Sequence, residues 1–230
     1  MPRTPDSDER RLRGALAEVR GERTTTNRWR TALTMSFYAG DLELALKILR
    51  EASGDVAPVA VLDDIVAPAM HDIGALWEHD EITVADEHLA TAMCHRLLAA
   101  IAPALEMAPA KSRETILLAT PTSERHTMGL LMANDVLYGA GYNTVLLGAG
   151  VPEAALGAAL MRHRPRIVAL SSTMPDPGEL AAAANVVRHL GPQAQLITGG
   201  RCGRVGPFGV PTRYVDRLSG LLTAVETVLR

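Results

Sequence analysis

The fold of this chain is decided by residues 115–129, which read TILLATPTSERHTMG. The stretch begins with a short β-branched and apolar run, 115–120, which is typical of a buried strand. A helical pattern starts after Gly129 and runs to Tyr138. Glu124 and His126 are therefore expected on the loop at the carboxyl end of a strand, the edge at which open α/β sheets bind their ligands.

The same alternation of strand and helix continues to the end of the chain. The predicted strands are 115–120, 143–148, 166–171 and 194–198, with a further short one at 213–216. The predicted helices are 127–140, 152–163, 177–190 and 217–229. Such alternation predicts a parallel sheet with helices on both faces. This domain is expected to span 109–230 and to begin with a linker, 109–114.

Residues 27–108 have a helical period instead. Asp41 and Asp55 are expected to cap a second and a third helix, and Thr83 with Asp86 resembles a capping box that opens a fourth. Four helices joined by short turns predict an antiparallel bundle. The residues before the bundle, 1–26, are expected to form a flexible, charged N-terminal segment.

Composition excludes several classes of function. A net charge of −3 over 230 residues does not match the basic footprint of a self-sufficient nucleic-acid binder. Cys94 and Cys202 are far apart and form no CxxC pattern, which argues against a disulfide framework or a zinc site. No apolar run is long enough to span a bilayer, and no signal-peptide core follows Met1. A cytoplasmic protein without a membrane partner is expected.

His126 is a candidate metal ligand. An imidazole that binds a metal usually donates its other ring N–H to a carboxylate, and Glu124 lies two residues earlier on the same loop. Gly129 would leave room for a large flat ligand at the start of the helix. The alternative is that Ser123 or Thr127 merely caps this helix while His126 points into solvent.

The loops after the third and fourth predicted strands carry groups that suit a polar ligand. Ser171 and Thr173 supply hydroxyls, and Gly199 and Gly200 supply backbone free of side chains. These groups suit a polar appendage threaded between the strands, such as a nucleotide tail. Ordinary strand-to-helix turns use the same residue types, and that alternative stays open.

Taken together, the three loops resemble the cobalamin-binding motif DxHxxG…SxL…GG. The first two elements are separated by 41 residues and the last two by 25. The matching residues are Glu124, His126, Gly129, Ser171, Thr173, Gly199 and Gly200. The resemblance implies a Rossmann-like (flavodoxin-like) doubly wound domain that binds cobalamin with its dimethylbenzimidazole tail displaced. His126 would be the lower axial ligand of cobalt, and the tail would lie between the Ser171 and Gly199 loops.

The chain departs from that motif at two positions. Glu124 stands where the family has aspartate, which lengthens the side chain that reaches His126 by one methylene. Thr173 stands where the family has leucine, which removes some apolar wall. Neither change removes a chemical role. The expected fold class is therefore α plus α/β, a four-helix bundle followed by a Rossmann-like parallel sheet.

The helical half resembles the Wx9EH pattern of CarH-type cobalamin-dependent photoreceptor regulators, with Trp77 followed by Glu87 and His88. The resemblance implies that the bundle covers the upper face of cobalamin and that these three side chains surround an adenosyl group. Adenosylcobalamin is therefore the expected cofactor, with methylcobalamin as the other form considered. By spacing alone, Trp77 also continues the apolar stripe of its helix and could belong to the bundle core.

Two features differ from those photoreceptors. Their tryptophan is followed directly by a histidine, whereas here Glu78 follows and His79 comes one step of about 100° further around the helix. They also carry a winged helix-turn-helix domain before the bundle, and the 26 residues here are too few for one. Direct DNA binding by this chain is therefore not expected, and self-association or a regulatory protein partner is.

The leading functional hypothesis is an adenosylcobalamin-binding sensor that regulates transcription in response to light. Cleavage of the cobalt–carbon bond would shift the helical cap and so change self-association or partner binding. The rival is a corrinoid carrier protein of a methyltransferase system. A mutase subunit is disfavoured because radical catalysis needs a large substrate barrel. A binding protein is thus favoured over an enzyme, and no catalytic residue is expected.

Overall fold

The computed structural model describes residues 25–102, 114–173, 176–204, 206 and 208–230. The chain divides into two compact units, 1–101 and 102–230. The predicted charged segment, apart from residues 25 and 26, and the predicted linker, apart from Glu114, lie outside the described residues. No helix within the described parts is long and apolar enough to cross a membrane.

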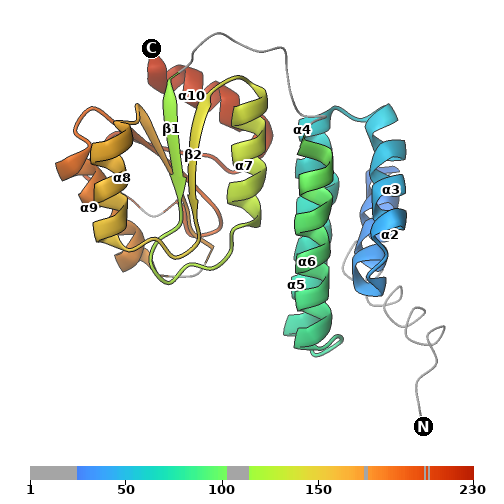
Figure 1. Ribbon diagram of the computed structural model, residues 1–230. Coiled ribbons are helices and arrows are strands. Elements are labelled where there is room, and N and C mark those ends of the chain that lie inside the picture. Colours follow the sequence, from blue (N-terminus) through green and yellow to red (C-terminus); the bar gives the residue numbers. More distant parts are fainter. Residues whose placement is uncertain (1–24, 103–113, 174–175, 205, 207) are drawn as a thin grey trace. The chain divides into compact units, whose positions relative to one another are not determined.

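The first unit is helical throughout its described part (Figure 1). Its elements are α2 (Thr25–Ala39), α3 (Leu42–Asp55), α4 (Pro58–Val61), η1 (Leu62–Val66), α5 (Ala67–Glu78) and α6 (Val84–Ile101). Because α4, η1 and α5 follow one another without a break, they correspond to the single third helix that the sequence predicts. Helix α2 packs against α3, α5 and α6, so the predicted bundle is confirmed.

Two of the three predicted helix caps are present. The Asp41 carboxylate accepts a hydrogen bond from the backbone N–H of Leu44 at 2.9 Å. Thr83 and Asp86 form a reciprocal capping box, since the Thr83 N–H donates to Asp86 Oδ2 at 2.8 Å and the Asp86 N–H to Thr83 Oγ1 at 3.3 Å.

The cap predicted at Asp55 is wrong. Helix α3 continues to Asp55, and the N-cap of α4 is Ala57, which offers no side-chain hydrogen bond. Pro58 explains this start, because proline disfavours a helical conformation in the residue before it and fits the first helical turn. The backbone of Ala57 is accordingly extended, with φ −59° and ψ 143°.

The long third helix contains a π turn at Leu62–Val66. The Ala67 N–H donates to the Leu62 carbonyl, five residues back rather than four. Pro68 follows at once, in the first turn of α5. Because proline has no N–H and its ring crowds the carbonyl four residues before it, the irregular turn lies where a regular helix would be strained.

A buried ion pair joins α2 to α5. The Asp72 side chain is 1% exposed and accepts from Arg30 through both carboxylate oxygens. The Thr34 hydroxyl also donates to Asp72, at 3.2 Å. Burial lowers the pKa of Arg30, because desolvation disfavours its charged form. The helical period does not predict this pair, because its two residues lie 42 positions apart in the sequence.

The second unit is the predicted parallel sheet, in the order β2-β1-β3-β4-β5. The strands are β1 (Thr115–Ala119), β2 (Asn143–Gly148), β3 (Ile167–Ser171), β4 (Gln195–Gly199) and β5 (Thr212–Tyr214). The helical elements between and after them are α7 (Met128–Gly139), α8 (Glu153–His163), α9 (Pro177–Leu190), η3 (Leu218–Gly220) and α10 (Leu221–Leu229). All strand pairs are parallel, and this part of the predicted fold is confirmed.

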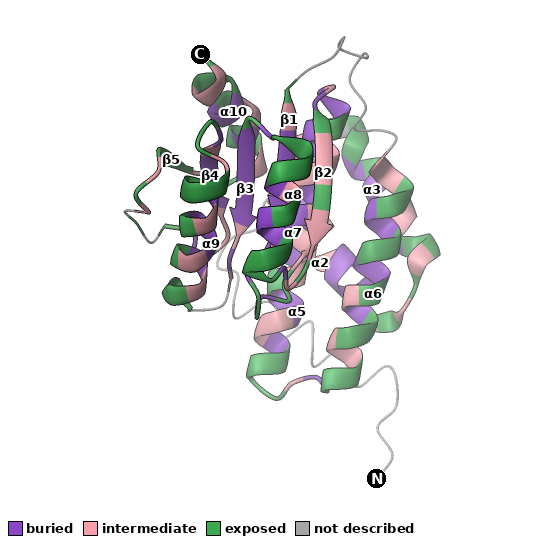
Figure 2. Ribbon diagram, turned by 60° about the vertical axis from the view of Figure 1, so that its left-hand side comes forward, coloured by how far each residue is buried: buried purple, intermediate pink, exposed green. Residues whose placement is uncertain are grey.

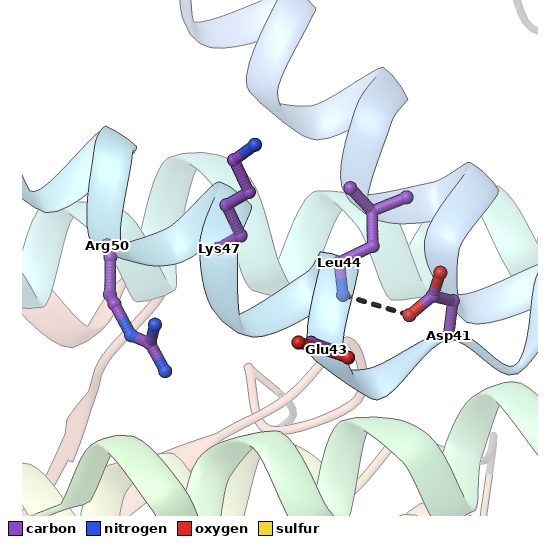
Figure 3. Close-up of a pocket in the computed structure, with 5 residues that line it drawn as sticks. All are labelled: Asp41, Glu43, Leu44, Lys47 and Arg50. Atoms are coloured by element: carbon purple, nitrogen blue, oxygen red, sulfur yellow. Dashed lines mark hydrogen bonds between the residues drawn. The ribbon is translucent and has the colours of Figure 1, made fainter.

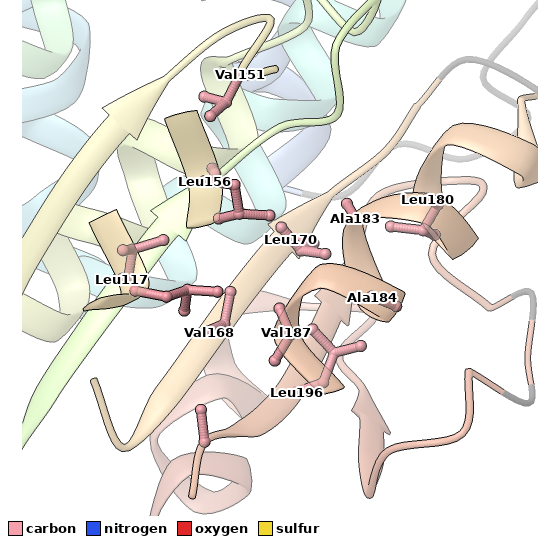
Figure 4. Packing of buried hydrophobic residues seen from close by; sticks show 13 residues of the cluster. Leu117, Val151, Leu156, Val168, Leu170, Leu180, Ala183, Ala184, Val187 and Leu196 are labelled. Carbon is pink, nitrogen blue, oxygen red and sulfur yellow. The ribbon is translucent and has the colours of Figure 1, made fainter. Parts of the chain in front are cut away.

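Helices cover both faces of the sheet (Figures 1 and 2). On one face, α8 and α9 pack against alternate residues of β1, β3 and β4, as Figure 4 shows for Leu117, Val168, Leu170 and Leu196. On the other face, α7 contacts β1 and β2, and α10 contacts β4. Burying the central strands on both faces explains their nearly continuous apolar sequences.

Candidate functional site

The predicted site residues lie at the carboxyl edge of the sheet. Strand β1 leads into the Glu124–His126 loop, β3 ends at Ser171, and β4 ends at Gly199. From β1 the chain passes to β2 on one side of the sheet and later to β3 on the other, so β1 and β3 flank the topological switch point. Ligands of doubly wound sheets bind in the crevice at such a point.

The Glu124 carboxylate joins the first two of these loops. Its side chain is 2% exposed. One oxygen accepts from the His126 backbone N–H at 2.8 Å and lies 2.7 Å from His126 Nδ1. The other accepts from the Thr173 backbone N–H at 2.6 Å. A buried carboxylate needs such partners, and here it also fixes the distance between the β1 and β3 loops.

This contact determines what His126 can do. An ionised carboxylate only accepts hydrogen bonds, so the neutral form of the ring carries its proton on Nδ1 and leaves the Nε2 lone pair free. The imidazole is 57% exposed. An accessible Nε2 on a ring held by a carboxylate is the arrangement that metal-binding histidines share. The predicted hydrogen bond between Glu124 and His126 is thus present, and the ligand role of His126 stays a prediction.

The alternative in which Ser123 or Thr127 caps α7 finds no support. Thr127 occupies the N-cap position but makes no side-chain cap hydrogen bond. Ser123 instead donates to Glu179 Oε2 from its hydroxyl at 2.7 Å and from its N–H at 2.8 Å. The β1 loop is therefore tied to the start of α9 rather than to α7.

The β3 and β4 loops are held together through their backbones. The Ser172 N–H donates to the Gly199 carbonyl at 3.0 Å, and the Cys202 N–H donates to the Ser172 carbonyl at 2.9 Å. The Cys202 thiol donates to the Thr173 carbonyl at 3.3 Å. Gly200 has a φ of +80°, and a Cβ there would lie 2.4 Å from the Ser172 carbonyl oxygen. Only glycine allows this close approach.

The residues present fit a large ligand that carries its own metal ion. His126 offers one accessible nitrogen, and the space that a Cβ would occupy at Gly129 has no other atom within 4 Å. Bare backbone at Gly199 and Gly200 lies beside the Ser171–Thr173 loop. The structure therefore brings the predicted residues of all three loops to one edge of the sheet.

A fourth loop, between β2 and α8, also lies at this edge and was not among the predicted site residues. Gly148 and Gly150 have φ values of +83° and +61°. The Gly150 N–H donates to Thr120 Oγ1 at 2.9 Å, and the Thr120 hydroxyl donates to the Glu124 carbonyl at 2.9 Å. The signal that could have revealed this loop is the Gly-Ala-Gly run that begins at the last residue of the second strand.

The other predicted residues lie in the helical unit, at the end of α5 and the start of α6. Trp77 is 46% exposed, so the interpretation that it belongs to the bundle core is wrong. The Glu87 carboxylate accepts from His88 Nδ1 at 2.6 Å and from the Thr91 hydroxyl at 2.8 Å. The His88 side chain is 76% exposed. An indole, a carboxylate and an imidazole are thus available to a ligand at one end of this helix pair.

His79 differs from His88 in its hydrogen bonding. Its Nδ1 lies 2.7 Å from the Ala75 carbonyl oxygen, within its own helix. That carbonyl can only accept, so the Nδ1 proton is used locally. Glu78, which stands where the photoreceptor family has histidine, is exposed.

A surface hollow elsewhere in the helical unit is lined by none of the predicted site residues. It runs along α3 and its cap, and Figure 3 shows the lining side chains Asp41, Glu43, Leu44, Lys47 and Arg50. All five come from one helix and its N-cap, and acidic and basic groups lie side by side. The hollow therefore lacks the converging elements that mark a ligand site.

Comparison with known proteins identifies both halves of the chain. Residues 29–102 and 114–213 match two protein families, each described as a B12 binding domain. Two proteins of Myxococcus xanthus are similar in sequence. The HTH-type transcriptional repressor CarH is 34% identical over 160 residues, 70% of this chain and 52% of that protein. The HTH-type transcriptional repressor CarA is 32% identical over 161 residues, 68% and 54% respectively.

The chain thus spans about half the length of the curated relatives it matches. Among solved structures, the monomethylamine corrinoid protein of Methanosarcina barkeri superimposes with a TM-score of 0.68 at 14% identity. The match covers 85% of this chain and 96% of that one. At this identity the likeness concerns the fold alone.

Proposed function

Because this chain belongs to the family of B12-binding domain proteins and binds cobalamin, we propose that it is an adenosylcobalamin-dependent regulator that responds to light. The observation that carries this proposal is that Trp77 is half-exposed at the end of α5, while Glu87 and His88 are paired at the start of α6. These three side chains together are not expected in a methyl carrier. The sequence similarity to two transcriptional repressors supports the regulatory part of the proposal.

On the lower face, His126 would hold the cobalt through Nε2. Glu124 keeps the Nδ1 proton in place, which raises the basicity of the ligating nitrogen. Through its second oxygen, Glu124 also accepts from the Thr173 backbone N–H, which links the ligand loop to the tail loop. Ser171 and the Gly199–Gly200 backbone would bind the displaced nucleotide tail.

On the upper face, the helical unit would cover the cofactor. In this proposal Trp77 forms a rigid wall against the adenosyl group, while Glu87 and His88 bind its ribose hydroxyls. Adenosylcobalamin supplies a cobalt–carbon bond that visible light cleaves. Once its upper group has left, Trp77 would lose its contacts, and the altered helical unit would favour a different self-association state or partner.

The second candidate is a corrinoid carrier that passes methyl groups between methyltransferase subunits. The monomethylamine corrinoid protein is similar to this chain in fold. That similarity does not separate the two functions, because both need the same lower-face loops. They differ in the upper ligand that the helical unit prefers.

The test is reconstitution in the dark with adenosylcobalamin and, separately, with methylcobalamin. For a sensor, green light should change the absorption spectrum of the adenosyl complex and also its elution volume in gel filtration. An unchanged spectrum and elution volume would exclude the light-responsive regulator. Methyl transfer from bound methylcobalamin to a thiol or tetrahydrofolate acceptor would favour the carrier.

A Trp77→Ala variant tests the upper face. It should weaken adenosylcobalamin binding about fivefold, since an aromatic contact of this kind contributes about 1 kcal/mol. Methylcobalamin binding should change little, because a methyl group does not reach the indole. Leu44→Ala, which removes another exposed apolar side chain of the same unit, is the matched control. Equal losses for both cofactors would contradict the assignment of Trp77 to the adenosyl group.

A further inference from the structure

Three side chains near β5 support the glycine loop, residues 199–203, from the side opposite Ser172. Tyr214 ends β5, Arg204 follows the glycine loop, and Asp216 lies just after β5. The Tyr214 hydroxyl lies 3.3 Å from the Gly200 carbonyl oxygen and 2.9 Å from Asp216 Oδ1. We call Arg204, Tyr214 and Asp216 the tyrosine network.

Arg204 completes this network from above the ring. Its guanidinium lies 4.8 Å from the centroid of the Tyr214 ring, and Nη2 lies 3.3 Å from Asp216 Oδ1. The hydrogen bond from Tyr214, with Arg204 adding to it, lowers the pKa of Asp216. Burial raises the pKa of Tyr214. At neutral pH a neutral phenol therefore donates its single proton, shared between an ionised carboxylate and the Gly200 carbonyl.

The glycine loop is thus held on two sides. On one side, the Ser172 carbonyl accepts from the Cys202 N–H and closely approaches Gly200. On the other side, the Tyr214 hydroxyl meets the Gly200 carbonyl. Gly203 adds a tight turn inside the loop, since a Cβ there would lie 2.4 Å from the Gly199 carbonyl oxygen. Glycines allow the backbone conformation of this loop but do not restrict the loop to it. Side chains outside the loop must therefore stabilise that conformation.

We propose that the tyrosine network is a positioning device that holds the glycine loop in the shape that accepts the nucleotide tail of cobalamin. Tyr214 then sets the preference of this chain for corrinoids with a tail over corrinoids without one. This inference rests on the proposed tail site between the Ser171 and Gly199 loops. The Tyr214 hydroxyl contacts the glycine loop rather than the His126 loop, so its influence should be confined to the tail.

The test compares dark binding of cyanocobalamin with that of dicyanocobinamide, a corrinoid without the nucleotide tail. Tyr214→Phe keeps the ring under Arg204 and removes only the hydroxyl. It should weaken cyanocobalamin binding about fivefold, the equivalent of one ordinary hydrogen bond, and leave dicyanocobinamide binding unchanged. The matched control is Tyr138→Phe, an exposed tyrosine on α7, which should change neither affinity.

A second pair of variants covers the case in which Tyr214→Phe does not fold. Arg204→Gln removes the exposed cation above the ring, and Arg213→Gln removes the same charge from the neighbouring exposed residue of β5. Only Arg204→Gln should weaken cyanocobalamin binding, by less than Tyr214→Phe does, while dicyanocobinamide binding stays unchanged. Selective loss in the variant without loss in its control supports the inference.

The outcomes separate the inference from the proposed function. If the unaltered protein binds neither corrinoid, the cobalamin site itself is wrong. If it binds both equally, the tail does not lie between the two loops, and the inference is overturned with that placement. If the unaltered protein prefers cyanocobalamin but Tyr214→Phe and Arg204→Gln keep the full preference, or lose both ligands equally, the network does not position the loop for the tail.

Discussion

At the scale of single residues, Glu124 is the residue on which the site depends most. Its two oxygens serve two loops, and the donors that they meet belong to His126 and to the Thr173 backbone. The sequence predicts the first contact, because the two residues are neighbours on one loop. It does not predict the second, which spans 49 positions. The extra methylene of glutamate does not weaken the contact with His126, whose Nδ1 is 2.7 Å away.

Glu124→Gln should therefore impair cobalamin binding more than its small change in shape suggests. The amide would turn an N–H towards donors that need an acceptor, and His126 would lose its preferred tautomer. Loss of such a supporting carboxylate typically weakens metal binding by about 10- to 100-fold. The measurement is a dark titration with hydroxocobalamin, followed through the absorption spectrum of the histidine-ligated complex.

Two further variants test whether the loss of cobalamin binding in Glu124→Gln comes from the support that Glu124 gives to His126. Glu179→Gln alters another carboxylate that supports the same loop, through Ser123, and should cost much less. His126→Ala should abolish the histidine-ligated spectrum altogether. A histidine-ligated spectrum that survives in His126→Ala would show that another residue is the lower ligand.

At the scale of helices and strands, the elements with a strong period could be predicted from the sequence and the irregular ones could not. The four main strands and the helices after them follow from apolar runs bounded by glycine and proline, and the structure has them in the predicted order. The π turn at Leu62–Val66 was not predictable, because a single extra residue in a hydrogen-bonded ring leaves no clear mark on an apolar stripe. The cap at Asp55 failed because the effect of Pro58 on its neighbour outweighs a nearby carboxylate.

The ion pair between α2 and α5 is the element-scale feature with the clearest energetic consequence. Asp72→Asn would leave the partly buried Arg30 guanidinium without its counter-ion. Removing one partner of such a pair costs about 3 kcal/mol of the free energy of unfolding. Urea denaturation followed by circular dichroism at 222 nm would measure this loss.

The matched control for that experiment is Glu51→Gln, an exposed carboxylate on α3. Surface changes of this type usually alter the free energy of unfolding by less than about 0.5 kcal/mol. If Asp72→Asn were no more harmful than Glu51→Gln, the pair would contribute little, and the apolar core alone would hold α2 against α5.

At the scale of the whole molecule, the two compact units each carry one of the two cysteines. Cys94 is buried in α6, and burial raises the pKa of its thiol to about 12. Cys202 is partly exposed in the glycine loop. Because the thiolate is the reactive form of cysteine, the two units should differ in the reactivity of their thiols. This difference can be measured on the intact chain.

With a disulfide reagent at pH 8, one thiol per chain should react quickly and the second only after denaturation. A pKa of about 12 leaves only about one Cys94 thiol in ten thousand ionised at that pH. Bound cobalamin should slow the fast reaction, since Cys202 lies in the loop that the proposed tail would contact. Cys202→Ser should remove the fast phase, and a fast phase that persists there would contradict the burial of Cys94.

The π turn also bears on how this protein can change in length over evolution. Its hydrogen-bonded ring holds one residue more than a regular helical turn. Loss of one residue inside 62–66 would restore a regular helix and keep the direction of Trp77, whereas loss of one residue later in α5 would rotate Trp77 by about 100°. Insertions and deletions in homologous chains should therefore gather at this turn rather than between it and Trp77.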